Sequence, residues 1–353
     1  MNLHPAAALT LNALVWGTSW WPLRQLAERG LHPLWATAII YAVAVGVILL
    51  LRPGALAQLL RTPVLWVLML AAGTTNAAFN WGVVAGDVVR VVLLFYLMPL
   101  WTVLLARALL REPISPQAGA RVLLALLGAA VVLWPPGSGW RGVPWPRSLP
   151  DWLGLVGGAS FALNNVMLRR EAGRPPQALA LAMFLGGAGL AGSLALLLTT
   201  TTTASVTASV AASVAASLSA AAVPWPPVPQ LGSVVLVGVM AALFLVGNLS
   251  LQFGAARLPA NVTSVVMLTE VVFAAGSAVW LGGGELTGQS LLGGGLILMA
   301  ALLAAVSPSE RPALLPAAGL PVLPVLPALP ALPVLPPNLP AIETPGPPGT
   351  ARP

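Results

Sequence analysis

One acidic residue lies in the middle of a long apolar segment, where an ionisable group can exchange a proton or bind a cation. Residues 264–281 read SVVMLTEVVFAAGSAVWL, and Glu270 is the single charged residue among them. A carboxylate at a bilayer centre costs about 2.5 to 3.5 kcal/mol, so we expect Glu270 to face the interior of a helix bundle. There it can exchange a proton or pair with a substrate ammonium group. The alternative is a protonated carboxyl that only hydrogen-bonds a neighbouring helix.

Amide side chains recur at helical spacing in other apolar segments. Asn76 and Asn80 are four residues apart, as are Asn248 and Gln252, so each pair forms one polar face of a helix. Asn164 adds an amide in a further apolar run. These faces are expected to line a shared cavity and bind the carboxylate or amine of an amino acid. The alternative is that they fasten helices together, at about 0.6 kcal/mol per contact.

Aromatic and charged residues near these segments are further candidates. Trp16 lies deeper in its apolar run than Trp20, so we expect it in a pocket wall, with interface anchoring as the alternative. The hydroxyl of Tyr96 needs a partner wherever it is buried, either in the pocket or in packing. Asp87 is well placed to cap a helix and Arg90 to extend outward. The alternative for these two residues is a gate at an outer mouth.

The composition indicates an integral membrane protein. The chain is 58% hydrophobic, has a mean hydropathy of +0.90 and is only 7% charged, against about 25% charged in ordinary soluble domains. It has no cysteine, and its two histidines each precede a proline, so we expect no metal site. The sequence has no phosphate-binding loop and no catalytic constellation. We therefore expect neither an enzyme nor a cofactor, and transport driven by a gradient instead of ATP.

The apolar segments are long enough for ten membrane-spanning helices. We place them near residues 6–22, 34–52, 63–84, 88–110, 117–135, 151–169, 176–198, 230–254, 259–281 and 288–306. All 16 basic residues are arginines, and they are scattered between the apolar runs, which argues against nucleic-acid binding. If the N-terminus is cytoplasmic, eleven of them fall on the inner side, so we predict that both termini are cytoplasmic.

Two segments lack the pattern of a membrane span. Residues 199–229 begin with a run of Thr, Ser, Ala and Val, and we predict a long outer loop with little fixed structure or a surface helix. From residue 307 to 353, prolines recur every few residues, which predicts a disordered or polyproline tail.

The two halves of the sequence resemble each other. Residues 76–89 align with 248–261 at a constant offset of 172, which superposes Asn76 on Asn248 and Asn80 on Gln252. WGTS at residue 16 similarly matches GGAS at residue 157. Each half contains five predicted spans, an odd number, so the second half enters the membrane inverted. We predict two inverted five-helix repeats, at 5–135 and 151–306, with a site near the midplane between them.

The same residues carry a family resemblance. LVWGTSWWPLR, GDVVRVVLLFYLMPLWTVLLARALLREPIS and MLTEVVFAAGSAVWLGGGELTGQSLLGGGLIL resemble the repeated domain of the drug/metabolite transporter superfamily, specifically its EamA-type permeases. The resemblance covers about residues 5–306 and implies a bacterial inner-membrane carrier, often an exporter of amino acids or related metabolites. Such proteins commonly have Glu-Pro in the ninth span, whereas Val271 follows Glu270 here. The resemblance thus implies that the second half lacks the kink that Pro99 can provide in the first.

We therefore expect an all-α secondary transporter that exports amino acids or related small metabolites by alternating access, with protons as a candidate coupling ion. One alternative is a multidrug efflux carrier, which hydrophobic cations would inhibit strongly. Another is a membrane scaffold whose proline-rich tail recruits partners. Deletion of residues 310–353 distinguishes the scaffold from a carrier, because a carrier keeps its flux and a scaffold loses its function.

Overall fold

The computed structural model describes residues 4–105, 107–108, 116–135, 137, 142–171, 173–204, 223–255, 257–258 and 266–306. The chain divides into two units, Met1–Ser309 and Glu310–Pro353. The second unit, with the predicted tail, lies outside the described residues, so the following description concerns the first. Every regular element in the described ranges is helical and none is a strand, which confirms the all-α prediction.

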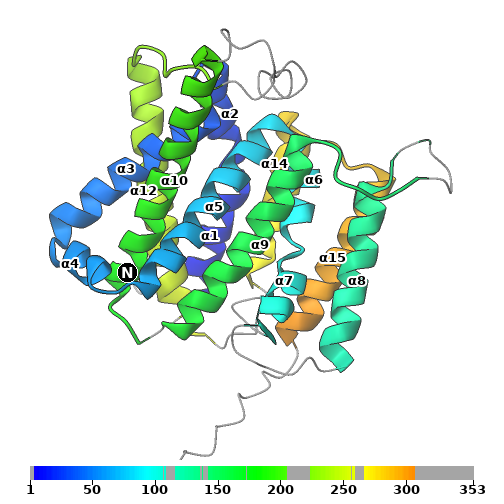
Figure 1. Ribbon diagram of the computed structural model, residues 1–353. Helices are drawn as coiled ribbons and strands as arrows, with labels where there is room; N and C mark the ends of the chain where they lie inside the picture. Colours follow the sequence, from blue (N-terminus) through cyan, green and yellow to red (C-terminus); the bar gives the residue numbers. More distant parts are fainter. Residues whose placement is uncertain are drawn as a thin grey trace, which may run out of the picture. The chain divides into compact units, whose positions relative to one another are not determined.

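The helices from α1 to α7 follow one another closely, whereas longer segments separate several of the later helices (Figure 1). In chain order they are α1 (Pro5–Thr18), α2 (Trp20–Glu28), α3 (Pro33–Leu51), α4 (Gly54–Leu60), α5 (Val64–Ala85), α6 (Val88–Phe95), α7 (Met98–Leu105), α8 (Pro116–Leu133), α9 (Leu149–Arg170), α10 (Pro176–Ala204), α12 (Leu231–Ala255), α14 (Thr269–Leu281) and α15 (Gly288–Val306). Within the described residues, six helical segments are long and apolar enough to cross a membrane. The predicted count of ten spans stays a prediction.

The two histidines cap the first turns of helices. His4 Nδ1 accepts the amide of Ala6 at 3.3 Å and caps α1, while His32 Nδ1 accepts the amide of Leu34 at 3.2 Å and caps α3. Burial lowers the pKa of His32 to about 4. Its Nδ1 therefore remains an unprotonated acceptor at neutral pH.

The predicted outer loop is partly helical. Helix α10 continues through Ala204, because the Thr and Ala residues after position 198 extend the helix begun at Pro176. The prediction of a loop from residue 199 was therefore wrong at its start. Residues 205–222 of this segment lie outside the described residues. At its far end, Trp225 stacks on Trp35 of α3, with ring centroids 6.0 Å apart.

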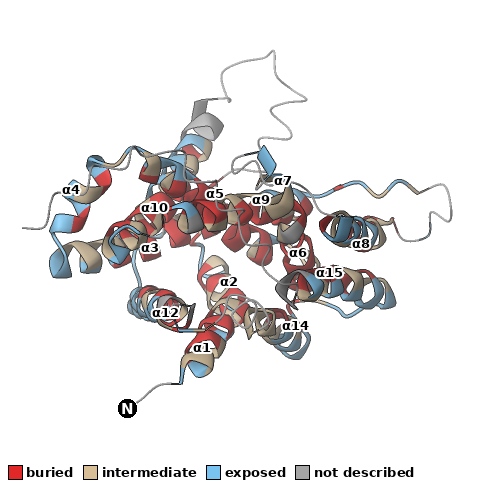
Figure 2. Cartoon of the chain, turned by 90° about the horizontal axis from the view of Figure 1, so that it is seen from below, coloured by how far each residue is buried: buried red, intermediate tan, exposed pale blue. Residues whose placement is uncertain are grey.

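Helix α5 lies at the centre of the unit, packed between α9 and α10 (Figure 2). Figure 2 shows the buried residues concentrated along it. The contact with α10 is close because it is made between glycines. A Cβ added to Gly186 would lie 1.9 Å from the carbonyl oxygen of Met69, and one added to Gly73 would lie 2.5 Å from the carbonyl oxygen of Gly186.

We expect Gly186→Ala to destabilise the protein, because its methyl group has to displace backbone atoms of α5. Overpacking of this kind costs about 1–3 kcal/mol. Gly189→Ala is the matched control: this glycine is exposed on the same helix with no atom within 4 Å of an added Cβ. The control is expected to be neutral or stabilising by up to about 1 kcal/mol. Thermal unfolding in detergent measures both, and a Gly186→Ala protein as stable as the control would contradict the packing argument.

Many helix contacts have an equivalent contact when each helix is replaced by its counterpart in the other predicted half. Helix α1 packs on α12 and α14, and its predicted counterpart α9 packs on α5 and on α6 and α7. Helix α8 packs on its counterpart α15, and α3 on its counterpart α10. The closest approaches also correspond. A Cβ added to Gly17 would lie 2.7 Å from the carbonyl oxygen of Glu270. A Cβ added to Gly158, which lies 141 residues after Gly17, would lie 2.4 Å from the carbonyl oxygen of Phe95.

Two apolar segments are interrupted in the middle. The segment from residue 88 divides into α6 and α7 at Tyr96 and Leu97, and Pro99 has no amide hydrogen for the carbonyl of Phe95. A turn at Leu268, whose backbone dihedrals stay helical (φ −62°, ψ −18°), precedes α14, although no proline follows Glu270. The implied absence of a kink in the second half stays a prediction. The turn places Glu270 in the first turn of α14.

Candidate functional site

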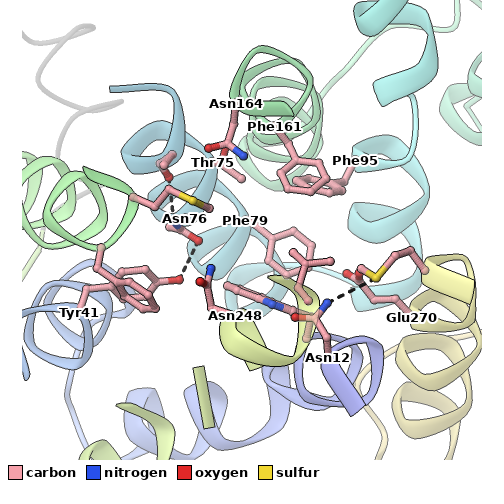
Figure 3. Close-up of a pocket in the computed structure, with 16 residues that line it drawn as sticks. Asn12, Tyr41, Thr75, Asn76, Phe79, Phe95, Phe161, Asn164, Asn248 and Glu270 are labelled. Carbon is pink, nitrogen blue, oxygen red and sulfur yellow. Dashed lines mark hydrogen bonds between the residues drawn. The ribbon is translucent and has the colours of Figure 1, made fainter. Parts of the chain in front are cut away.

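A cavity lies inside the unit, where helices of both predicted halves meet (Figure 3). Its volume is about 80 Å³, which is room for several water molecules at roughly 10–15 Å³ each. Two of its walls carry polar side chains and the others are apolar or aromatic. The lining residues are Asn12, Trp16, Tyr41, Ala72, Thr75, Asn76, Phe79, Phe95, Phe161, Asn164, Met183, Phe184, Asn248, Leu251, Met267 and Glu270.

Glu270 reaches the cavity from the interrupted ninth segment. It is half-buried, and its position in the first turn of α14 sets its carboxylate near the positive end of that helix. The hydroxyl of Tyr96 lies near this carboxylate and donates its hydrogen to the carbonyl oxygen of Met267 at 3.3 Å. The carboxyl group of Glu270 lines the cavity.

The opposite wall is built on Asn76 of α5. The hydroxyl of Tyr41 donates to Asn76 Oδ1 at 2.7 Å, and Asn76 Nδ2 donates to the carbonyl oxygen of Ala72 at 2.8 Å. An amide nitrogen carries two hydrogens, and the bond to Ala72 uses one of them. Figure 3 shows Tyr41 and Asn76 facing Glu270 across the cavity.

Two buried amide oxygens in the cavity wall have no partner among the described residues. Asn12 Oδ1 and Asn164 Oδ1 both lack a hydrogen bond, although the two side chains are 0% and 2% exposed. The nitrogen of Asn12 donates weakly to the sulfur of Met267 at 3.5 Å. Sequence reasoning missed Asn12, although it is the single amide of the first apolar run and lies four residues before Trp16, on the same helix face.

Aromatic rings close the remaining walls. Trp16 stacks on Phe244 with centroids 4.7 Å apart. Phe95 contacts Phe79 at 4.9 Å and Phe161 at 5.3 Å. Trp16 thus lies in the cavity wall, where the sequence analysis expected it.

Three of the expected lining residues are not among the described residues that line the cavity. Asn80 is fully buried beside α3, where its nitrogen donates to Thr37 Oγ1 at 3.1 Å. Tyr96 is buried behind the wall and reaches the site only through its hydroxyl. The side chain of Gln252 lies outside the described residues. Trp20, four residues after Trp16, is 2% exposed and donates to Ser277 Oγ at 2.9 Å.

Asp87 and Arg90 lie in a second cluster, at the N-terminal end of α6. Asp87 caps the helix by accepting the amide of Arg90 at 2.7 Å, as predicted, and it also accepts the amide of Glu285 at 2.9 Å. Arg90 forms a two-bonded ion pair with Asp151 of α9, at 2.6 and 3.2 Å, and donates to the carbonyl oxygen of Val132. Asp151 was not singled out, although the spacing Ser148-x-x-Asp151 is that of a capping box.

A second cavity opens at this cluster. Arg24 donates to the carbonyl oxygens of Val83 and Gly86, and Gln289 donates to those of Val131 and Trp134, so both satisfy helix ends. Burial lowers the pKa of Arg24, while the carboxylates of Glu28 and Asp87 act in the opposite direction. The lining residues are Arg24, Gly86, Asp87, Arg90, Val132, Gly282, Gly283, Gly284, Glu285, Thr287, Gln289 and Ser290. In the described part of the chain, no three His, Asp or Glu side chains lie together as a metal site.

Comparison with known proteins finds a family match in the first predicted repeat. Residues 5–134 match the model of the EamA-like transporter family, which confirms the resemblance inferred from the sequence over that half. No curated protein matches the sequence. A solved structure titled "Crystal structure of protein" aligns with 85% of this chain and 96% of its own, at 19% identity and a TM-score of 0.49. A likeness of that degree does not establish a fold.

Proposed function

Because residues 5–134 match the EamA-like transporter family of the drug/metabolite transporter superfamily, we propose that this multi-pass membrane protein is a secondary active exporter. Its substrates are amino acids or related small amphiphilic metabolites. Two inverted five-helix repeats alternate in exposing the central cavity to either side. The protein resides in a bacterial inner membrane with both termini in the cytoplasm.

The cavity is the observation that carries this proposal. It is assembled from α1, α3, α5 and α6 of the first predicted repeat and from α9, α10, α12 and α14 of the second. Its ionisable residue lies in the first turn of a helix that starts inside an apolar segment. In secondary transporters, interrupted helices at the interface between repeats are typical of the substrate site.

The coupled contacts between the halves support the proposed repeat. If a two-fold axis relates the halves, a contact of α1 with α14 requires one of α9 with α6 and α7, and both contacts are present. A rocking motion of one repeat against the other then changes equivalent contacts on the two sides of the cavity.

We assign the outer gate to the cluster around Asp87 and Arg90. The bonds of Asp87 to Glu285 and of Arg90 to Asp151 join α6 of the first repeat to residues of the second. Opening of the outer end requires these bonds to break. The central residue Glu270 and the amides of Asn76, Asn164 and Asn248 bind the substrate, and protons are the candidate coupling ion.

Flux through proteoliposomes tests the transport function. We expect the purified full chain to accelerate the exchange of at least one labelled amino acid or related amine in a saturable manner, relative to protein-free vesicles. Unlabelled substrate on the far side should drive counterflow, which a carrier supports. Counterflow absent for the whole panel would contradict the proposal.

Site-directed labelling of a single introduced cysteine tests alternating access. The sequence contains no cysteine, so no native thiol reacts with the label. A single Asn248→Cys substitution places a thiol in the cavity wall. We expect membrane-impermeant maleimides to label it from either side of the membrane, and substrate to slow both reactions. A thiol that reacts from neither side would show a sealed interior, and one that reacts from a single side under all conditions would argue against alternation.

A further inference from the structure

The charge of the central cavity is one-sided. Among the described lining residues, Glu270 carries the one carboxyl group, and no arginine or histidine accompanies it. Arg24 of α2 and Arg90 of α6 serve the outer cluster instead, where they donate to the backbone or to Asp151. A negatively charged group in the cavity would therefore face a carboxylate without a compensating cation.

The cavity also offers open hydrogen-bond acceptors. The acceptor oxygens of Asn12 and Asn164 are buried and without partners in the described structure. Two donors of the wall are used, since Thr75 donates to Ala71 at 2.8 Å and Tyr41 donates to Asn76, whereas the nitrogen of Asn76 keeps one hydrogen. A buried acceptor without a partner costs about 1–3 kcal/mol, so a ligand that brings donors recovers this free energy.

Two features suit the remainder of such a ligand. The aromatic faces of Trp16, Phe79, Phe95 and Phe161 line the cavity, so a flat apolar body can pack there. Aromatic faces also attract a cation within about 6 Å of a ring centroid. Neither feature gives a binding partner to a carboxylate.

We propose that the substrates of this cavity are primary amines that carry a net positive charge, with a compact aromatic or apolar body and no carboxylate. The ammonium group has three N–H donors. It would pair with Glu270 and donate to the open oxygens of Asn12 and Asn164, while the apolar body occupies the aromatic walls. This inference rests on the proposed transport function and narrows its substrates, from amino acids and related amphiphilic metabolites, to the amines among those related metabolites.

Three ligands with the same phenyl ring test the inference. Phenethylamine has only the amine, phenylalanine has the amine and a carboxylate, and 3-phenylpropionate has only the carboxylate. Their affinities are measured by titration calorimetry at neutral pH, on the full chain in nanodiscs of uncharged lipid. We expect phenethylamine to bind at least about tenfold more tightly than phenylalanine, which corresponds to about 1.4 kcal/mol, and 3-phenylpropionate to bind most weakly.

Variants assign the preference to the cavity. Glu270→Gln should lower the affinity for phenethylamine at least about tenfold, since a charge-assisted bond becomes a neutral one. Asn12→Leu and Asn164→Leu should each lower it several-fold. Glu28→Gln is the matched control, because Glu28 is exposed on α2 and contacts only Gln25 among its described hydrogen bonds. This variant is expected to bind as the wild type does.

The contrary results separate the inference from the transport function. If phenylalanine or 3-phenylpropionate binds as tightly as phenethylamine, or if Glu270→Gln keeps the amine affinity, the assignment to amines is overturned. Counterflow of phenylalanine in proteoliposomes would then still support a carrier. Absence of binding by all three ligands also overturns the inference. If the amine binds as expected but no flux is seen, the site chemistry stands and the transport function fails.

Discussion

Glu270→Gln is expected to lower substrate flux by about 100-fold or more, the largest effect of any single substitution in the cavity. Glutamine keeps the shape and hydrogen-bonding capacity of the side chain, but it can neither ionise nor carry a proton. Because Glu270 supplies the single negative charge of the described cavity wall, the amide leaves both a cationic substrate and a coupling proton without a site. Initial rates of counterflow in proteoliposomes measure the loss.

Two further variants distinguish this role from structural support. Glu28→Gln makes the same chemical change on the exposed face of α2 and should leave the flux unchanged. Glu270→Asp keeps the charge and should retain part of the flux, since the carboxylate is withdrawn by one methylene. If Glu270→Gln transports normally but unfolds at a different temperature, the carboxyl serves helix packing and not transport.

The sequence predicted which segments surround the site, but only half of the polar face on α5. Asn76 and Asn80 are four residues apart on α5, and both were expected in the cavity. The structure turns Asn76 to the cavity and Asn80 to Thr37 of α3. Positions separated by four residues differ by about 40° around a helix, and a cavity of this size admits only one of them. The choice depends on the neighbouring helix, which hydropathy does not reveal.

Helix interruptions were the least predictable feature of the fold. The apolar run at 6–22 was expected as one span, but α1 ends at Thr18 and α2 begins at Trp20. Ser19 Oγ donates to the carbonyl oxygen of Trp16, and Pro22 has no amide hydrogen for that of Thr18. The interruption at Leu268 has no proline after it, so composition alone could not indicate it. Continuous segments such as α5 were predicted to within about one residue.

Asp151 shows why tertiary ion pairs escape sequence reading. Its local signal is a capping box with Ser148, and that box is present in the structure. Nothing in the sequence relates it to Arg90, which lies 61 residues earlier. The pair forms because the start of α6 lies beside the start of α9, an arrangement set by the packing of α5 between α9 and α10.

Replacing Arg90 is expected to lower the stability of the protein more than replacing its ion-pair partner Asp151. The side chain of Asp151 is 3% exposed and that of Arg90 is 32% exposed. Arg90→Met leaves a buried carboxylate with only the amides of Arg147 and Ser148, at 3.1 and 3.4 Å, and we expect a loss of about 3 kcal/mol. Asp151→Asn leaves a half-exposed guanidinium that still donates to Val132, so its loss should be nearer 1 kcal/mol.

The double variant completes a thermodynamic cycle. Arg90→Met combined with Asp151→Asn removes both charges, so it should be more stable than Arg90→Met alone, because no unpaired carboxylate remains buried. Thermal unfolding in detergent measures the three stabilities. Additive losses would show that the two side chains do not interact. Since the pair also joins the two predicted repeats at the outer end, a real coupling should appear in transport as well. When both changes are added to Asn248→Cys, the thiol is expected to label faster from the outer side than in Asn248→Cys alone, as a weakened outer gate requires.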